Sequence, residues 1–164
     1  MWVRVMNWML ADDEPPRPSV GSLLKSVGVR IRGVVAVADL RISDGIVEIE
    51  GGRGRGDQVY ALTGIASKVR DLWSAAERGR PSEHYGAEFV LKVGADQFQA
   101  QFDGHASDVA AGMRVTVAGR LELVGEYEWE SFLLPDTRTD WLIAEIVEVP
   151  DDDILVRLAH PSTE

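Results

Sequence analysis

Strict alternation of side-chain type is the feature that most constrains this chain. Within residues 96–102, Phe98, Ala100 and Phe102 occupy one parity and glutamines occupy positions of the other. Residues 113–123 repeat the pattern, with Met, Val, Gly or Leu at every odd position and mostly polar side chains between them. A period of two is that of an extended strand with one buried face. The chain is therefore predicted to be all-β.

Shorter apolar runs on both sides of these segments predict further strands. An Asp-Gly pair at 44–45 is a turn signal, because glycine tolerates positive φ, and Gly-Ala at 94–95 suits a tight hairpin. Residues 103–112 have room for a short helix. The runs that we expect to form strands are residues 27–37, 41–50, 59–72, 87–93 and 141–149.

Composition divides the chain into four parts. Residues 1–19 are predicted to be a flexible segment, since their second half holds three prolines and no apolar period. Residues 20–58 are predicted to form a β-strand extension that ends in a Gly/Arg loop, with four glycines in residues 51–57. Residues 59–150 would form the main domain, and residues 151–164 an acidic C-terminal tail.

The order of hairpin, short helix and strand in the main domain carries a resemblance. Residues 86–94 and 98–104 form the hairpin, and a Gly-Met-Arg-Val-Thr-Val-Ala-Gly-Arg stretch at 112–120 follows the helix. This order resembles the OB-fold nucleic-acid-binding superfamily over about residues 59–149. The resemblance implies a five-stranded antiparallel barrel with one short helix, in which Gly119 lets a strand coil at the barrel corner. Another small antiparallel barrel or a sandwich is the alternative topology.

Charge restricts the classes of partner. The net charge of −10 argues against a protein that coats duplex DNA or an anionic membrane with its whole surface. Residues 1–58 hold eight basic and eight acidic residues, residues 59–150 hold eight and fifteen, and residues 151–164 hold one and four. The first ten residues are too short an apolar stretch to span a bilayer, so we expect a cytoplasmic protein.

Residues that carry catalysis or hold metals are sparse. The chain contains no cysteine, which excludes disulfides and thiolate ligands. His84, His105 and His160 are far apart in sequence and show no metal-ligand spacing, and no serine has the companions of a nucleophile. We therefore expect no enzyme activity, no metal site and no cofactor.

The leading hypothesis is a non-enzymatic OB-fold protein of bacterial type that binds single-stranded nucleic acid through a local basic and aromatic strip. Alternation places Phe89 and Phe98 in the core, so contacts are expected from arginines, a lysine and two tryptophans elsewhere. The predicted nucleic-acid-binding residues are Arg30, Arg32, Arg53, Arg55, Trp73, Lys92, Arg114, Arg120 and Trp129.

The acidic balance favours a second hypothesis from another class. In this alternative the chain is an acidic protein-protein interaction module, or it self-associates as a homo-oligomer, and it does not bind nucleic acid.

Overall fold

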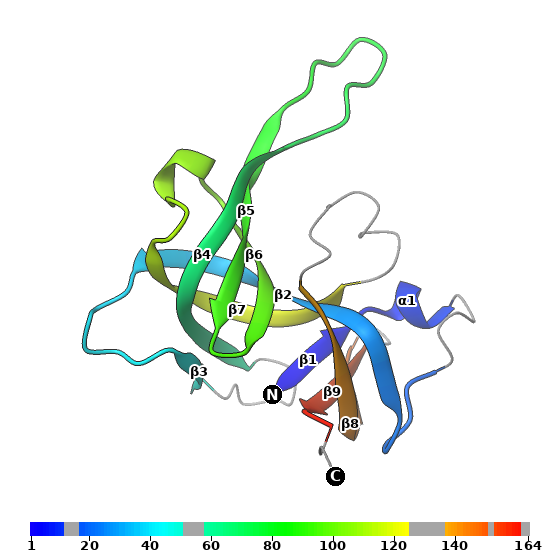
Figure 1. Cartoon of the computed structure of the whole chain (residues 1–164). Coiled ribbons are helices and arrows are strands. Elements are labelled where there is room, and N and C mark those ends of the chain that lie inside the picture. Colours follow the sequence, from blue (N-terminus) through cyan, green and yellow to red (C-terminus); the bar gives the residue numbers. More distant parts are fainter. Residues whose placement is uncertain (12–16, 51–57, 125–136, 151–152, 162–164) are drawn as a thin grey trace.

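The computed structural model describes residues 1–11, 17–50, 58–124, 137–150 and 153–161 (Figure 1). Its helices are short, since α1 spans Asn7–Ala11 and the 3-10 helix η1 spans Ala106–Asp108. None of the helices in these ranges is long and apolar enough to cross a membrane. The strands are β1 Trp2–Val5, β2 Leu23–Val37, β3 Gly45–Glu50, β4 Val59–Trp73, β5 His84–Val93, β6 Asp96–Phe102, β7 Arg114–Val124, β8 Arg138–Glu148 and β9 Ile154–Ala159.

These strands join in one sheet that closes on itself in two rings. The first ring runs β4–β5–β6–β2–β7 and back to β4. The second ring runs β2–β8–β9–β1–β7 and back to β2. Both rings use β2 and β7, because the first part of the long β2 pairs with β8 and the rest pairs with β7. In Figure 1 the first ring lies at the left, and β1, β8 and β9 lie at the lower right.

The predicted fold, a five-stranded antiparallel OB-type barrel with one short helix, is wrong. The structure is all-β, but the sheet formed by the described residues has nine strands and is mixed, with β2 parallel to β6 and β1 parallel to β7. The strand expected last in the barrel, β8, pairs with β9 and with the start of β2 instead. Alternation predicts which residues are strands, but it carries no information on which strands are neighbours.

One hydrophobic core extends through both rings, and the alternating segments supply much of it. Phe89 and Phe98 are fully buried, which confirms their predicted place in the core. Ile143 of β8 and Val156 of β9 are equally buried in the second ring. The buried side chains of the two rings thus belong to one continuous cluster.

Two glycines stand opposite each other where β2 and β7 pair, Gly33 and Gly119. A Cβ on Gly33 would lie 1.8 Å from the backbone oxygen of Ala118, and one on Gly119 would lie 2.1 Å from that of Arg32. Neither position admits a side chain unless the backbone moves. Gly119 was expected to let a strand coil at a barrel corner, and the structure shows that it also admits the close approach of β2.

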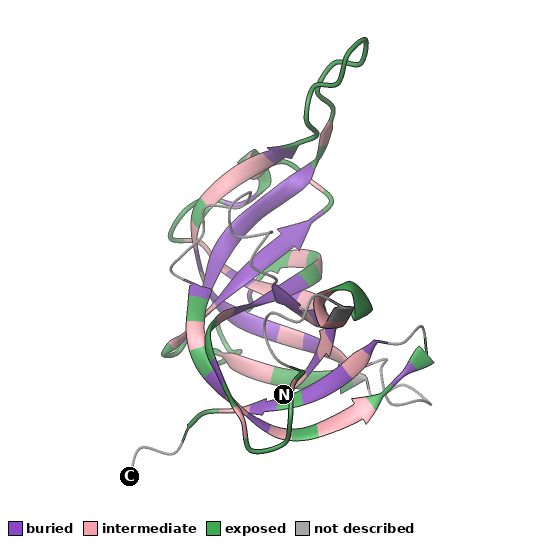
Figure 2. Cartoon of the chain, turned by 90° about the vertical axis from the view of Figure 1, so that its right-hand side faces the viewer, coloured by how far each residue is buried: buried purple, intermediate pink, exposed green. Residues whose placement is uncertain are grey.

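The hairpin that joins β4 to β5 projects from the first ring. Its tip, residues 74–83, is exposed throughout (Figure 2). Trp73 and Tyr85 flank the tip and are 59% and 53% exposed. The base of this hairpin brings β4, β5 and the segment before η1 together.

Candidate functional site

Two rows of side chains run across the outer face of the sheet, because residues paired on neighbouring strands point to the same side. Both rows cross β4, β5, β6, β2 and β7, and the second extends to β1. Their members come from segments far apart in sequence, so only strand pairing brings them together. The first row is Arg70, Glu88, Gln101, Arg32 and Arg120, and the second is Ser67, Val90, Gln99, Arg30, Glu122 and Arg4.

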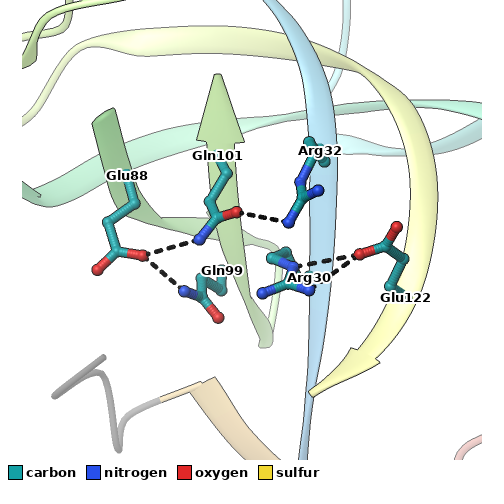
Figure 3. A network of polar contacts seen from close by, with 6 residues as sticks. All are labelled: Arg30, Arg32, Glu88, Gln99, Gln101 and Glu122. Carbon is teal, nitrogen blue, oxygen red and sulfur yellow. Dashed lines mark hydrogen bonds and ion pairs between the residues drawn. The ribbon is translucent and has the colours of Figure 1, made fainter. Parts of the chain in front are cut away.

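Glu88 is a fully buried member of the first row and bonds to one glutamine of each row (Figure 3). One of its carboxylate oxygens accepts a hydrogen bond from Arg70 Nε at 2.5 Å, and the same two side chains form an ion pair. The other oxygen accepts from Gln99 Nε2 at 2.6 Å and from Gln101 Nε2 at 3.3 Å. A buried charge needs such partners, since an unpaired carboxylate away from water is strongly unfavourable.

The arginines of the two rows differ in their exposure. Arg30 is only 5% exposed, and its Nη2 lies 3.0 Å from Glu122 Oε2. Arg32 is exposed and donates from Nη2 to Gln101 Oε1 at 3.3 Å (Figure 3). Arg120 is also exposed and stands directly opposite Arg32 on β7. We call the five arginines of these rows, Arg4, Arg30, Arg32, Arg70 and Arg120, the arginine band.

A small hollow of ≈ 60 Å³ lies at the β1 end of the band. Trp2, Arg4 and Arg120 are among the residues that line it. Arg4 forms an ion pair with Asp153 at 3.5 Å, and Tyr60 accepts a hydrogen bond from the Trp2 backbone N–H at 2.8 Å. Burial raises the pKa of Tyr60, so its hydroxyl stays neutral at neutral pH. The hollow is therefore lined by one aromatic residue, which is partly buried against the core, and by two arginines of the band.

Of the predicted nucleic-acid-binding residues, the structure brings Arg30, Arg32 and Arg120 together. Lys92 is exposed on β5, outside the band. Trp73 is exposed at the base of the projecting hairpin. Arg53, Arg55 and Trp129 lie outside the described residues.

Arg114, another predicted contact, lies outside the band, and its guanidinium holds the loop between β2 and β3. Its Nη2 lies 2.8 Å from Asp44 Oδ1, and its Nη1 donates to the Asp39 carbonyl at 3.1 Å. Nη2 also donates to the carbonyl of Ile42. Both terminal nitrogens of the guanidinium therefore bond to the loop.

Sequence reasoning missed Trp2 and Arg4 as members of a site. The signal was present, because Trp2 and Arg4 alternate with Val3 and Val5, which are buried. That period of two identifies residues 2–5 as a strand with an outer face, whereas our prediction included them in a flexible segment, residues 1–19, and judged their apolar stretch too short to span a bilayer.

A groove of ≈ 340 Å³ lies beside the second half of β2. One wall is Gly33–Val37, and the other includes Phe102, Asp103 and Asp108. β6 pairs with β2 only at positions 30–32, so no strand in the described ranges pairs with this edge of β2 beyond Arg32. Val34 and Val37 are 74% and 75% exposed there.

A cluster of one aspartate and two histidines lies at the base of the projecting hairpin. Asp71 Oδ1 is 2.9 Å from His84 Nε2 and 3.9 Å from His105 Nδ1, and the two imidazole rings stack with their centroids 4.2 Å apart. A hydrogen bond from the Ala106 backbone N–H, and a second from His84, hold the pKa of Asp71 below its usual value. The sequence separation of these histidines had argued against their meeting.

Comparison of the chain with protein-family models, with curated proteins and with solved structures found no match. The resemblance to the OB-fold superfamily therefore stays a prediction.

Proposed function

We propose that the chain binds single-stranded nucleic acid at the arginine band. The observation that carries this proposal is the exposed pair Arg32 and Arg120, directly opposite each other on β2 and β7. Two exposed guanidinium groups side by side suit a phosphate, because guanidinium groups bind phosphate oxygens in pairs of parallel hydrogen bonds.

The surroundings of the pair support a local contact with one strand. Glu88, Glu122 and Asp153 engage Arg70, Arg30 and Arg4, so part of the positive charge of the band is balanced by carboxylates of the protein. With a net charge of −10, the rest of the surface would repel the two backbones of a duplex. Trp2, which is partly exposed, lines the same hollow as Arg120, and stacking of a base on an aromatic ring is worth about 1–3 kcal/mol.

A salt titration tests this proposal. We expect a fluorescein-labelled oligothymidine to bind at low salt and to be released steeply as salt rises, as measured by anisotropy. Replacing both Arg32 and Arg120 by alanine should lower the slope of log K against log salt by about 1.4, or about 0.7 for each phosphate contact.

Arg41→Ala is the matched control, because the Arg41 side chain is 92% exposed and lies in a loop away from the band. It should leave both affinity and slope unchanged. The proposal fails if no binding appears at low salt with tens of micromolar protein, or if Arg41→Ala weakens binding as much as the double substitution.

The groove beside β2 favours a second candidate, in which an extended segment of a partner protein adds to the edge of β2. The backbone N–H of Ala38 donates to the Arg114 carbonyl, so the even-numbered residues in this part of β2 direct their backbone groups toward β7. Backbone groups of alternate residues, Gly33, Val35 and Val37, then point away from β7 toward the groove. Asp103 and Asp108 in the other wall favour a partner segment that alternates apolar and basic side chains.

Two synthetic heptapeptides test this candidate, one alternating valine with lysine and one alternating valine with glutamate. We expect only the lysine peptide to shift the NMR amide signals of Gly33, Val35 and Val37. Val37→Pro, which removes one donor at the edge, should weaken binding about fivefold, the effect of one hydrogen bond.

Val20→Pro is the control for that substitution, because Val20 is exposed and precedes Gly21 in the turn closed by Ser22 N and Ser19 O. It should bind the lysine peptide like the original chain. Equal binding of both peptides, or amide shifts confined to other strands, would exclude strand addition at β2.

A further inference from the structure

The base of the projecting hairpin brings together three side chains with the donor atoms of a metal site. They come from separate elements: Asp71 from β4, His84 from the start of β5, and His105 from the residue before η1. One ligand atom from each lies within 4.8 Å of the other two. We propose that Asp71, His84 and His105 bind a divalent transition-metal ion, with zinc as the best match.

The donor set defines the class of ion. Two imidazole nitrogens and one carboxylate oxygen suit Zn²⁺, Co²⁺, Ni²⁺ or Cu²⁺, whereas Ca²⁺ and Mg²⁺ prefer oxygen ligands throughout. Three protein ligands leave one tetrahedral position for water or a small anion. Such a site resembles exchangeable or catalytic zinc sites more than closed structural ones.

The separations allow an ion to enter with small movements. Bonds of about 2.0–2.2 Å in a tetrahedron place ligand atoms about 3.3–3.6 Å apart. The distance from Asp71 Oδ1 to His84 Nε2 is shorter than this at 2.9 Å, and that to His105 Nδ1 is longer at 3.9 Å. The His105 side chain is 66% exposed, so it can turn out of its stack with His84 and close the longer distance.

Neighbouring groups restrict the orientation of the Asp71 and His84 side chains. The Ala106 N–H bonded to Asp71 Oδ1 at 2.8 Å orients the carboxylate, and it comes from the residue that follows His105. Trp73 packs edge-on against His84 with ring centroids 5.2 Å apart, which restricts the orientation of that imidazole. Contacts of this kind orient metal ligands and increase affinity.

The alternative is that Asp71 and His84 form only a hydrogen-bonded pair that braces the hairpin. His160 provides the comparison, because its Nε2 lies 3.1 Å from Asp96 Oδ2 and its ring packs on Trp141. That second His–Asp pair has no third His, Cys, Asp or Glu ligand among the described residues. The metal proposal predicts that only the first pair responds to metal ions.

Titration with Co²⁺ at neutral pH, followed by its visible absorption and by competition with Zn²⁺, tests the inference. We expect one equivalent to bind with the spectrum of tetrahedral cobalt. His105→Ala should weaken binding at least about 100-fold, since losses of 10- to 100-fold follow when only a supporting group around a ligand is removed. His160→Ala should bind cobalt unchanged.

His105→Ala is the decisive variant, because its exposed side chain can be removed without disturbing the core, as circular dichroism would verify. His84→Ala and Asp71→Asn should show comparable losses. Failure to bind either ion at millimolar concentration, or equal losses in His105→Ala and His160→Ala, would overturn the proposal. Neither result depends on whether nucleic acid binds at the arginine band.

Discussion

Replacing Glu88 by alanine is expected to lower the free energy of unfolding by about 3 kcal/mol. The substitution leaves the amide donors of Gln99 and Gln101 unpaired, Gln99 being fully buried, and removes the counter-charge of Arg70. Breaking a buried ion pair from one side usually costs about 3–5 kcal/mol. The Arg70 side chain is 33% exposed and can be partly hydrated, which places the expected loss at the lower end.

Urea unfolding followed by circular dichroism measures this loss, with two companion variants. Glu88→Gln should cost only about 1 kcal/mol, because the shape is kept and an amide can still accept one hydrogen bond. Glu148→Ala removes an exposed glutamate from β8 and should change stability by less than about 0.5 kcal/mol. If Glu88→Ala were as mild as Glu148→Ala, the buried network would not contribute to stability.

The burial of Glu88 also shows what alternation can predict. The pattern placed β6 at its observed bounds and β7 within one residue, because a period of two belongs to the backbone itself. It also assigned Phe98 and Gln99 to opposite faces, as observed. It did not predict that Gln99 is as fully buried as Phe98. Whether a polar face is covered depends on the neighbouring strands, and the local pattern does not contain them.

The order of the strands in the sheet could not be predicted from the sequence for the same reason. The apolar run at 27–37 predicted part of β2, but the alternation of residues 30–32 gives no sign that they pair with β6 on one side and β7 on the other. That placement puts Arg30 between Gln99 and Glu122. It converts an arginine expected on the surface into one side of a buried ion pair.

The histidine cluster was missed through a different error. Metal-ligand spacing in sequence finds sites carried by one helix or one short loop. His84 and His105 are instead brought together because β5 and β6 form a hairpin, and the chain after β6 returns to the β4–β5 base. An antiparallel hairpin places the start of its first strand close to the residues that follow its second strand. That relation follows from the predicted hairpin and would have supplied the missing signal.

Gly119→Ala is expected to lower the free energy of unfolding by about 3 kcal/mol, the upper part of the range for overpacking. The new Cβ would lie 2.1 Å from the backbone oxygen of Arg32, so no side-chain rotation can relieve the contact. β2 and β7 would have to separate at this point. Because both rings close through this strand pair, the strain should reach the whole sheet, and we expect one cooperative transition at lower urea concentration.

Gly45→Ala separates this effect from the general consequence of replacing a strand glycine. Gly45 lies in the edge strand β3, and a Cβ there would meet no atom within 4 Å. Alanine also reduces the conformational entropy of the unfolded chain, so this variant should be neutral or more stable by up to about 1 kcal/mol. Gly33→Ala, whose Cβ would lie 1.8 Å from the Ala118 oxygen, should reproduce the loss seen for Gly119→Ala. Similar stabilities for Gly119→Ala and Gly45→Ala would mean that β2 and β7 do not approach as closely in solution as the structure requires.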